Sequence, residues 1–207
     1  MIVLGLTGSI GMGKSTTAAM FAEMGIPVHD ADSTVHELYR GEAVAPVAEA
    51  FPEAIVDGVV DRTRLAQAVL GNPAALRRLE AIVHPLVRKA EVEFVEKHRQ
   101  AAAPFVVLDI PLLFEAGGAD RVDKIVTVTA SPEVQRERVL SRPGMTEEKF
   151  RSILEKQLPD LEKQRRSDYV IHTDRGIDHA RAAVADLVRE LVGESRPDGD
   201  SIRSEIS

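Results

Sequence analysis

The sequence predicts an α/β fold with one five-stranded, mostly parallel sheet and helices on both faces. Three observations carry this prediction. Short apolar runs alternate with helical patterns along most of the 207 residues, the order that builds a parallel sheet covered on both sides. A glycine-rich motif directly follows the first run. Hydrophobic residues make up 44% of the chain and charged residues 29%, an ordinary globular composition.

Five short segments rich in Val, Ile, Leu and Phe indicate strands. They are Ile2–Leu6, Ile26–His29, Phe105–Leu108, Lys124–Val128 and Tyr169–Ile171. In a parallel sheet the carboxyl ends of the strands lie where ligands bind. We therefore expect functional residues directly after these segments.

Helix boundaries are indicated by capping residues, by glycine and by proline. The expected helices are Ser15–Met24, one that starts at Asn72-Pro73, one that starts at His84-Pro85 and runs to about Ala101, one capped by Thr146, and a last one from Asp178. Because proline has no N–H group and is favoured at the first helical position, His84-Pro85 is expected to begin a new helix.

Two connections are too long to be simple crossovers, so we expect an insertion and a lid within one unit. The expected boundaries are 1–193 for the unit, 1–32, 104–134 and 167–193 for its core, 33–103 for a helical insertion, and 135–166 for a helical lid. Residues 194–207 are mainly Glu, Ser, Arg, Gly and Asp, which predicts a disordered tail.

Composition and charge exclude several classes of function. The absence of cysteine excludes disulfides and thiolate metal sites. A net charge of −7 argues against a general nucleic-acid binder. The first residues predict a strand rather than a signal peptide, and the apolar stretch 101–114 is too short to span a bilayer. We expect a cytoplasmic protein without a membrane partner, either a monomer or a small homo-oligomer.

A phosphate-binding loop is indicated by Gly8-Ser9-Ile10-Gly11-Met12-Gly13-Lys14-Ser15, which follows a strand and opens a helix. Its glycines allow close backbone approach, and the helix N-terminus attracts anions. We expect Lys14 to reach the β- and γ-phosphates of ATP and Ser15 to ligate Mg²⁺. The residues expected to contact the nucleotide are Gly8, Gly11, Met12, Gly13, Lys14, Ser15 and Thr16.

The rest of the chain favours a kinase over other phosphate-loop proteins. The Asn/Thr-Lys-x-Asp guanine-binding motif of GTPases is missing. The third expected strand ends at Asp109 without an adjacent Glu to activate water. Asp109 is therefore expected to hold Mg²⁺, while a bound acceptor hydroxyl attacks the phosphate.

Asp32 is the candidate base for that hydroxyl, because it follows the second expected strand. The alternative is that Asp32 only caps a helix. Asp30 and His29 are interpreted as a turn residue and a strand-end histidine.

Several arginines follow the fourth expected strand and could stabilise the charge that develops during transfer. They are Arg136, Arg138, Arg142, Arg165 and Arg166. At spacing i, i+4, Arg138 and Arg142 are expected to share one helix face and to contact ATP from a lid that closes over it. The alternative for each arginine is an ordinary solvated helix charge.

The chain closely resembles the dephospho-coenzyme A kinase family up to about Gly193. The resemblance rests on segments in the family's order: Gly5–Ser15, Val28–Asp32, His84-Pro85-Leu86-Val87-Arg88, Leu108–Glu115, Arg142, Gln157 and Arg166–Ile171. Two departures are mild: Ser9 stands where the family usually has Gly, and His172-Thr173-Asp174 replaces a common Asp-Asn or Asn-Asn ending.

The resemblance implies a P-loop kinase fold and the transfer of phosphate from ATP to the ribose 3′-hydroxyl of dephospho-CoA. It implies Asp32 as the catalytic base, with Lys14 and Arg142 as further catalytic residues. The helical insertion would bind the acceptor. The residues expected to contact it are Thr7, Asp32, His84, Arg88, Asp109 and Pro111, although His84 as a helix cap remains an alternative.

Two other functions remain open at this point. Another small P-loop kinase, acting on a nucleoside monophosphate or a small metabolite, would share the phosphate loop and the lid. A nucleotide-binding switch would bind ATP without transferring phosphate.

Overall fold

The computed structural model describes residues 1–195, and these fall into two compact units. One comprises Met1–Val28 and the chain from His98 onward, and the other comprises His29–Lys97. Most of the predicted tail, residues 196–207, lies outside the described residues, whereas Glu194 still belongs to the last helix.

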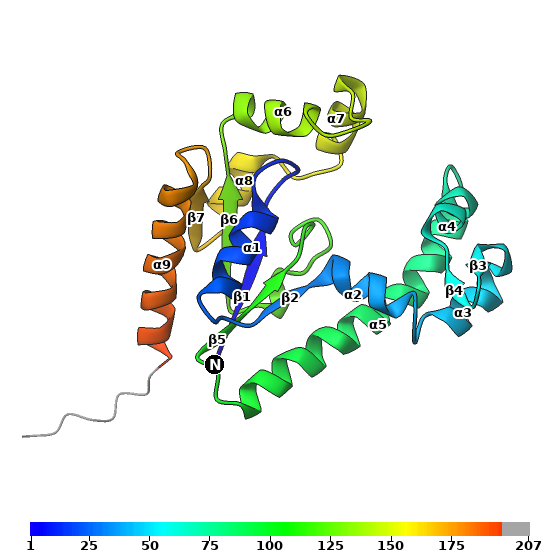
Figure 1. Ribbon diagram of the computed structural model, residues 1–207, viewed down its shortest axis with the longest axis horizontal. Coiled ribbons are helices and arrows are strands. Elements are labelled where there is room, and N and C mark those ends of the chain that lie inside the picture. Colours follow the sequence, from blue (N-terminus) through cyan, green and yellow to red (C-terminus); the bar gives the residue numbers. More distant parts are fainter. Residues whose placement is uncertain (196–207) are drawn as a thin grey trace, which may run out of the picture. The chain divides into compact units, whose positions relative to one another are not determined.

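The first unit is built on the predicted sheet, whose strand order is β2-β5-β1-β6-β7 (Figure 1). The strands are β1 (Ile2–Thr7), β2 (Val28–Asp30), β5 (Phe105–Asp109), β6 (Lys124–Thr129) and β7 (Tyr169–His172). Strand β1 pairs in parallel with both β5 and β6, and β6 pairs in parallel with β7. All five predicted strands are confirmed, with boundaries that differ by at most two residues.

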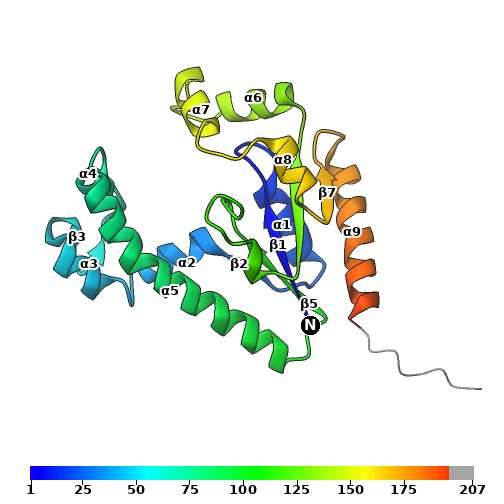
Figure 2. The same ribbon diagram turned by 180° about the vertical axis from the view of Figure 1, so that it is seen from behind.

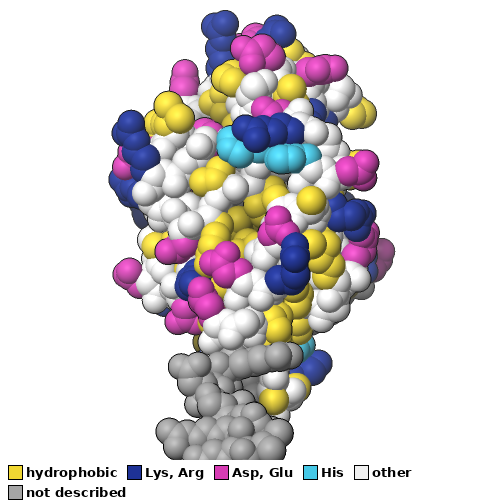
Figure 3. Space-filling model, turned by 90° about the vertical axis from the view of Figure 1, so that its left-hand side faces the viewer, with side chains coloured by type: hydrophobic (Ala, Val, Ile, Leu, Met, Phe, Trp, Pro, Cys, Tyr) yellow, Lys and Arg dark blue, Asp and Glu magenta, His cyan; other side chains and the backbone are white. Residues whose placement is uncertain are grey.

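Helices cover both faces of this sheet. Helices α1 (Lys14–Glu23) and α9 (Ile177–Glu194) share one apolar cluster with the strands, and α8 (Asp160–Arg165) lies on the opposite face (Figure 2). On the face drawn in Figure 3, hydrophobic side chains form a narrow band among charged ones. No helix among residues 1–195 is long and apolar enough to cross a membrane.

Helices α6 (Pro132–Leu140) and α7 (Glu147–Leu154) follow β6, and Thr146 caps α7 as predicted. The prediction that Arg138 and Arg142 share a helix face is wrong, because α6 ends at Leu140 and Arg142 follows the capping residue. The physical reason is Pro143, which disfavours helical geometry at the preceding residue.

The second unit has its own apolar core, which includes Tyr39, Val47, Phe51 and Leu65. Its elements are α2 (Ala31–Leu38), α3 (Val44–Ala50), a 3₁₀ turn at Pro52–Ala54, β3 (Ile55–Val56), β4 (Val59–Val60), α4 (Arg62–Val69) and α5 (Pro73–Gln100). The hairpin β3–β4 was not predicted. Its signal was Asp57-Gly58, a dipeptide that favours the positive φ of such turns and adopts it here.

Helix α5 is continuous over 28 residues, with Pro85 inside it. The predicted helix start at His84-Pro85 is therefore wrong. Without an N–H group on Pro85, the carbonyl of Ala81 has no helical donor. The helix nevertheless continues because Leu79 and Val83 before the proline and Leu86 after it pack in the same core.

We expect Pro85→Ala to raise the free energy of unfolding by about 1–3 kcal/mol, because it restores a hydrogen bond in the helix interior. Pro85 is exposed, so its replacement by Ala loses little packing. Denaturant titration measures the change. Pro73→Ala is the matched control, since Pro73 occupies the first helical position, where no bond is missing. Equal effects at the two positions would contradict this account.

Candidate functional site

The glycines of the loop between β1 and α1 are required by close packing. A Cβ on Gly8 would lie 2.4 Å from Cγ2 of Val128 in β6. A Cβ on Gly11 would lie 2.5 Å from Cγ2 of Val139 in α6, and Gly11 has a φ of +78°. Larger residues would therefore displace the loop from β6 and α6.

Side chains from outside the loop bind three successive loop carbonyls. Gln135 Nε2 donates to the carbonyl of Ile10 at 2.8 Å, and Thr173 Oγ1 donates to that of Met12 at 2.8 Å. The Arg138 guanidinium lies 3.5 Å from the carbonyl of Gly11. Satisfied carbonyls let the loop keep a conformation in which its N–H groups are free for an anion.

Free N–H groups are available at the end of the loop and in the first turn of α1. Within residues 1–195 they have no acceptor at Gly11, Gly13, Lys14, Ser15 and Thr16. Unpaired N–H groups at a helix N-terminus form an anion site. The predicted phosphate-binding loop thus has the donors that it requires.

Lys14 and Asp109 are brought together by α1 and β5. Lys14 Nζ donates to Asp109 Oδ1 at 2.5 Å, and the Asp109 side chain is only 4% exposed. Nearby in the fold, Thr7 Oγ1 donates to the carbonyl of Pro111 at 3.3 Å. Four of the predicted site residues therefore form two direct contacts, although the fully buried hydroxyl of Thr7 is already used within the protein.

The residues present fit a magnesium ion that is shared with phosphates. The Ser15 hydroxyl is exposed and has no partner within the described chain, and Asp109 offers the carboxylate of the predicted site. No cluster of three or more His, Asp or Glu among residues 1–195 could hold a metal alone. Mg²⁺ commonly takes one or two carboxylates together with substrate phosphates.

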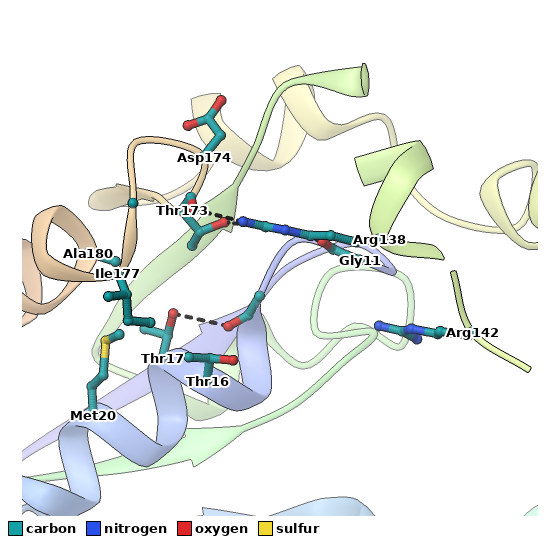
Figure 4. A pocket seen from close by; sticks show the side chains of 12 residues that line it. Gly11, Thr16, Thr17, Met20, Arg138, Arg142, Thr173, Asp174, Ile177 and Ala180 are labelled. Carbon is teal, nitrogen blue, oxygen red and sulfur yellow. Dashed lines mark hydrogen bonds between the residues drawn. The ribbon is translucent and has the colours of Figure 1, made fainter. Parts of the chain in front are cut away.

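A pocket of about 460 Å³ adjoins the loop (Figure 4). It is lined by the loop, α1, the segment after β7 and the start of α9, together with two arginines: Gly11, Gly13, Thr16, Thr17, Met20, Arg138, Arg142, Thr173, Asp174, Gly176, Ile177 and Ala180. Sequence reasoning missed the contributions of Thr173 and Ile177. The available signal was that Thr173 follows the carboxyl end of a parallel strand.

The two arginines of this pocket differ in their contacts. Arg138 donates to Thr173 twice, to Oγ1 at 2.9 Å and to the carbonyl at 2.8 Å (Figure 4). Arg142 is exposed, and its guanidinium has no partner in the part of the chain that is described. Arg138 is therefore fixed in place, whereas Arg142 is free to bind a ligand.

The other three arginines that the sequence analysis singled out form surface ion pairs. Arg136 pairs with Glu147 at 2.7 Å, and Arg166 pairs with Glu162 at 2.9 Å. Arg165 lies 3.8 Å from Glu162. These three side chains do not line the pocket, so for them the structure favours the solvated helix charge.

Asp32 lies in the first turn of α2, and Asp30 is the residue that caps this helix. Asp30 Oδ1 accepts from the N–H groups of Asp32 at 2.8 Å and Ser33 at 3.1 Å. The alternative that Asp32 is the cap is therefore wrong. Asp32 is exposed, and its carboxylate has no partner within residues 1–195, so it is free to accept a proton.

His29, the middle residue of β2, is a packed histidine rather than a second candidate base. Its ring lies 5.1 Å from that of Phe94. Burial lowers the pKa of His29, although Asp30 and Glu37 oppose this shift. Burial therefore favours the neutral ring.

His84 and Arg88 lie one turn apart on α5, and both are exposed. His84 does not cap a helix, because α5 continues through it. Neither side chain has a partner among the described residues. At i, i+4 they share one helix face, which is compatible with a common ligand.

A buried ion pair joins α8 to the segment after β5. Lys163 of α8 is fully buried and lies 2.9 Å from Glu115, whose side chain is 17% exposed. Burial alone would raise the pKa of Glu115, but Lys163 and the N–H group of Leu158 outweigh it and hold this pKa below its usual value of 4.5. Sequence reasoning assigned no role to Lys163, because nothing local marks a lysine as buried.

Comparisons with known proteins agree on one family. A family model described as dephospho-CoA kinase matches residues 2–179. The chain is 61% identical over 194 residues to a dephospho-CoA kinase of Mesorhizobium japonicum, covering 94% of this chain and 98% of that protein. It is 56% identical over 191 residues to one of Rhizobium meliloti, covering 92% and 98%.

Solved structures share the fold. A Thermus thermophilus protein, TT1252, is 36% identical with a TM-score of 0.79, over 91% of this chain and 96% of that one. A dephospho-CoA kinase from Campylobacter jejuni is 21% identical with a TM-score of 0.67, over 91% and 96%. A shikimate kinase from Acinetobacter baumannii is 17% identical with a TM-score of 0.51, over 94% of each chain. The predicted P-loop kinase fold is confirmed.

We expect Glu115→Gln to lower the free energy of unfolding by about 3–5 kcal/mol, because it leaves the buried Lys163 ammonium unpaired. Lys163→Met should cost less, since Glu115 retains some solvent and the N–H group of Leu158. Denaturant titration of both variants measures these costs. Equal costs would contradict the burial argument.

The same pair gives a pH dependence. Because the pKa of Glu115 is depressed in the folded protein, the stability from the pair is present above about pH 4.5 and lost as the pH falls through the folded-state value. We expect the stability of Glu115→Gln to fall less steeply below pH 4.5 than that of the unaltered protein. If the free energies of unfolding of the two proteins fell in parallel below pH 4.5, this expectation would be wrong.

Proposed function

The chain belongs to the dephospho-CoA kinase family, and we propose that its residues transfer the γ-phosphate of ATP to the ribose 3′-hydroxyl of dephospho-CoA. The products are coenzyme A and ADP. The observation that carries the assignment of residues is the direct junction of the phosphate loop and the adjoining pocket, since Gly11 and Gly13 belong to both. One nucleotide can then place its phosphates on the loop and its base in the pocket.

The phosphates of ATP bind the free N–H groups of Gly11, Gly13, Lys14, Ser15 and Thr16. Lys14 exchanges its contact with Asp109 for the β- and γ-phosphates, because a polyphosphate carries more negative charge than one carboxylate. Asp109 is then available, with Ser15, to hold Mg²⁺. When bound, Mg²⁺ neutralises charge on the β- and γ-phosphate oxygens.

The adenosine part of ATP occupies the pocket between α1 and α9. Thr16, Thr17 and Met20 form the wall on α1, and Ile177 and Ala180 form the wall on α9. The position of Arg138 is fixed by Thr173, so Arg138 borders this pocket as a rigid group. Arg142, which is free, contacts the phosphates and stabilises the charge that develops during transfer.

The acceptor hydroxyl gives its proton to Asp32 as it attacks the γ-phosphate. The capping contacts of Asp30 fix the backbone of Asp32 and leave its carboxylate unpaired. His84 and Arg88 are the groups of α5 that contact the acceptor, and Thr7, Asp109 and Pro111 are the other proposed contacts.

The finer organisation is part of the same proposal. The segment 33–103 binds the acceptor and 135–166 acts as a lid. The enzyme works in the cytoplasm on small molecules, as a monomer or small homo-oligomer, without nucleic acid or a membrane. The net charge of −7 supports small-molecule substrates over nucleic acid.

We expect dephospho-CoA to accelerate ADP release from ATP-Mg²⁺ by about a hundredfold or more over the rate with water alone. Nucleoside monophosphates and shikimate, tested in the same coupled assay, should give no comparable rate. Acceleration by one of those acceptors instead would indicate another small kinase. Slow release with every acceptor would indicate a nucleotide-binding switch.

We expect Asp32→Asn to lower kcat by about a hundredfold or more, since it removes the base, and to leave the Kd for ATP nearly unchanged. Asp30→Asn is the matched control, because Asn caps helices as well as Asp does, and kcat should stay within about threefold. Steady-state kinetics and calorimetry measure the two quantities. Loss of ATP binding in Asp32→Asn would assign Asp32 to structure or metal instead.

A further inference from the structure

Both backbone groups of Ile10, in the middle of the phosphate loop, are bound by glutamine side chains. Gln135 Nε2 donates to the carbonyl of Ile10 at 2.8 Å. The N–H group of Ile10 donates to Gln157 Oε1 at 3.1 Å. One side chain thus acts as a donor and the other as an acceptor on the same residue.

The two glutamines enclose the segment that carries the free arginine of the pocket. Gln135 lies in α6 and is only 6% exposed. Gln157 lies between α7 and α8 and is half-buried. Arg142 lies between them in sequence, and the residues from Gln135 to Gln157 form most of the predicted lid. The segment from Gln135 to Gln157 is therefore attached to Ile10 at both of its ends.

Further contacts hold both attachments in place. At the first, α6 is so close to the loop that a Cβ on Gly11 would lie 3.0 Å from the carbonyl of Gln135. At the second, the N–H group of Leu158, next to Gln157, donates to Glu115 at 2.8 Å, and Glu115 pairs with buried Lys163. Movement of either end would therefore strain the loop.

We propose that Gln135 and Gln157 are positioning residues for phosphate transfer. They fix the Ile10 peptide and link the phosphate loop to both ends of the segment from Gln135 to Gln157, which carries Arg142. The proposal rests on the binding of ATP at this loop, as proposed above. Because the N–H group of Ile10 is already used by Gln157, it is not one of the phosphate donors. Its role is to hold the loop so that the N–H groups from Gly11 onward are ready for the anion.

The different polarity of the two bonds provides a direct test. At position 157 an acceptor is required, so Gln157→Glu keeps the bond and Gln157→Leu loses it. At position 135 a donor is required, so Gln135→Glu and Gln135→Leu both lose it. Both Glu variants add a carboxylate beside the same loop, and the comparison with the Leu variant at each position separates the lost hydrogen bond from the added charge.

We expect Gln135→Glu to raise the KM for ATP about tenfold and Gln157→Leu about fivefold, the scale of one lost hydrogen bond. Gln157→Glu should stay within about threefold of the unaltered enzyme. In all variants the KM for dephospho-CoA should stay within about twofold. Steady-state kinetics with ATP-Mg²⁺ and calorimetry with a non-hydrolysable ATP analogue measure these values.

Gln67 on α4 is the matched control, because it is exposed and has no partner among residues 1–195. Gln67→Glu and Gln67→Leu should leave the KM for ATP unchanged. Equal effects of Glu at positions 135 and 157 would overturn the proposal, as would a lower melting temperature without any change in the KM for ATP. If the unaltered protein failed to bind the analogue, the proposed ATP site itself would be wrong.

Should Gln135→Glu fail to fold, the comparison of Gln157→Leu with Gln157→Glu decides alone. Both substitutions lie at a half-buried position outside a helix. A rise in the KM for ATP in Gln157→Leu that Gln157→Glu reverses supports the proposal, and equal KM values in the two contradict it.

Discussion

The rest of the site depends on the satisfaction of three successive carbonyl groups in the phosphate loop. The carbonyls of Ile10 and Met12 are bound by Gln135 and Thr173, and that of Gly11 lies beside Arg138. A loop with unsatisfied carbonyls would lower its free energy by turning them toward solvent or a cation. Its N–H groups would then no longer point toward one anion. The glycines only permit the loop conformation. The side-chain donors select this conformation among those that glycine allows.

The two substrates place different demands on the chain. ATP needs a rigid set of donors, which the first unit provides through bonds between segments far apart in sequence. In the proposed mechanism the acceptor hydroxyl needs an unpaired carboxylate. The cap formed by Asp30 meets this need, because it fixes the first turn of α2 without using the side chain of Asp32. The proposed base is therefore free because a neighbouring residue takes over the structural role.

The sheet and the phosphate loop were predictable because their signals are local: β-branched runs, glycine spacing and the strand that precedes them. Helix α5 was divided wrongly because Pro85 is a strong local signal that packing on both sides overrides. The contacts of Gln135 and Thr173 with the loop were not predictable in this way. They reach Ile10 and Met12 across more than a hundred residues, and glutamine and threonine carry no sequence pattern for such a contact.

The most direct test of this account follows the backbone amides of the loop by NMR during a titration with a non-hydrolysable ATP analogue and Mg²⁺. The account predicts large shifts for the amide protons of Gly11, Gly13, Lys14 and Ser15, which gain phosphate acceptors. The amide proton of Ile10, already bound to Gln157, should barely move. A shift of the Ile10 amide proton as large as those of its neighbours would show that the loop rearranges when the analogue binds. That result would contradict a phosphate loop that is already in its binding conformation.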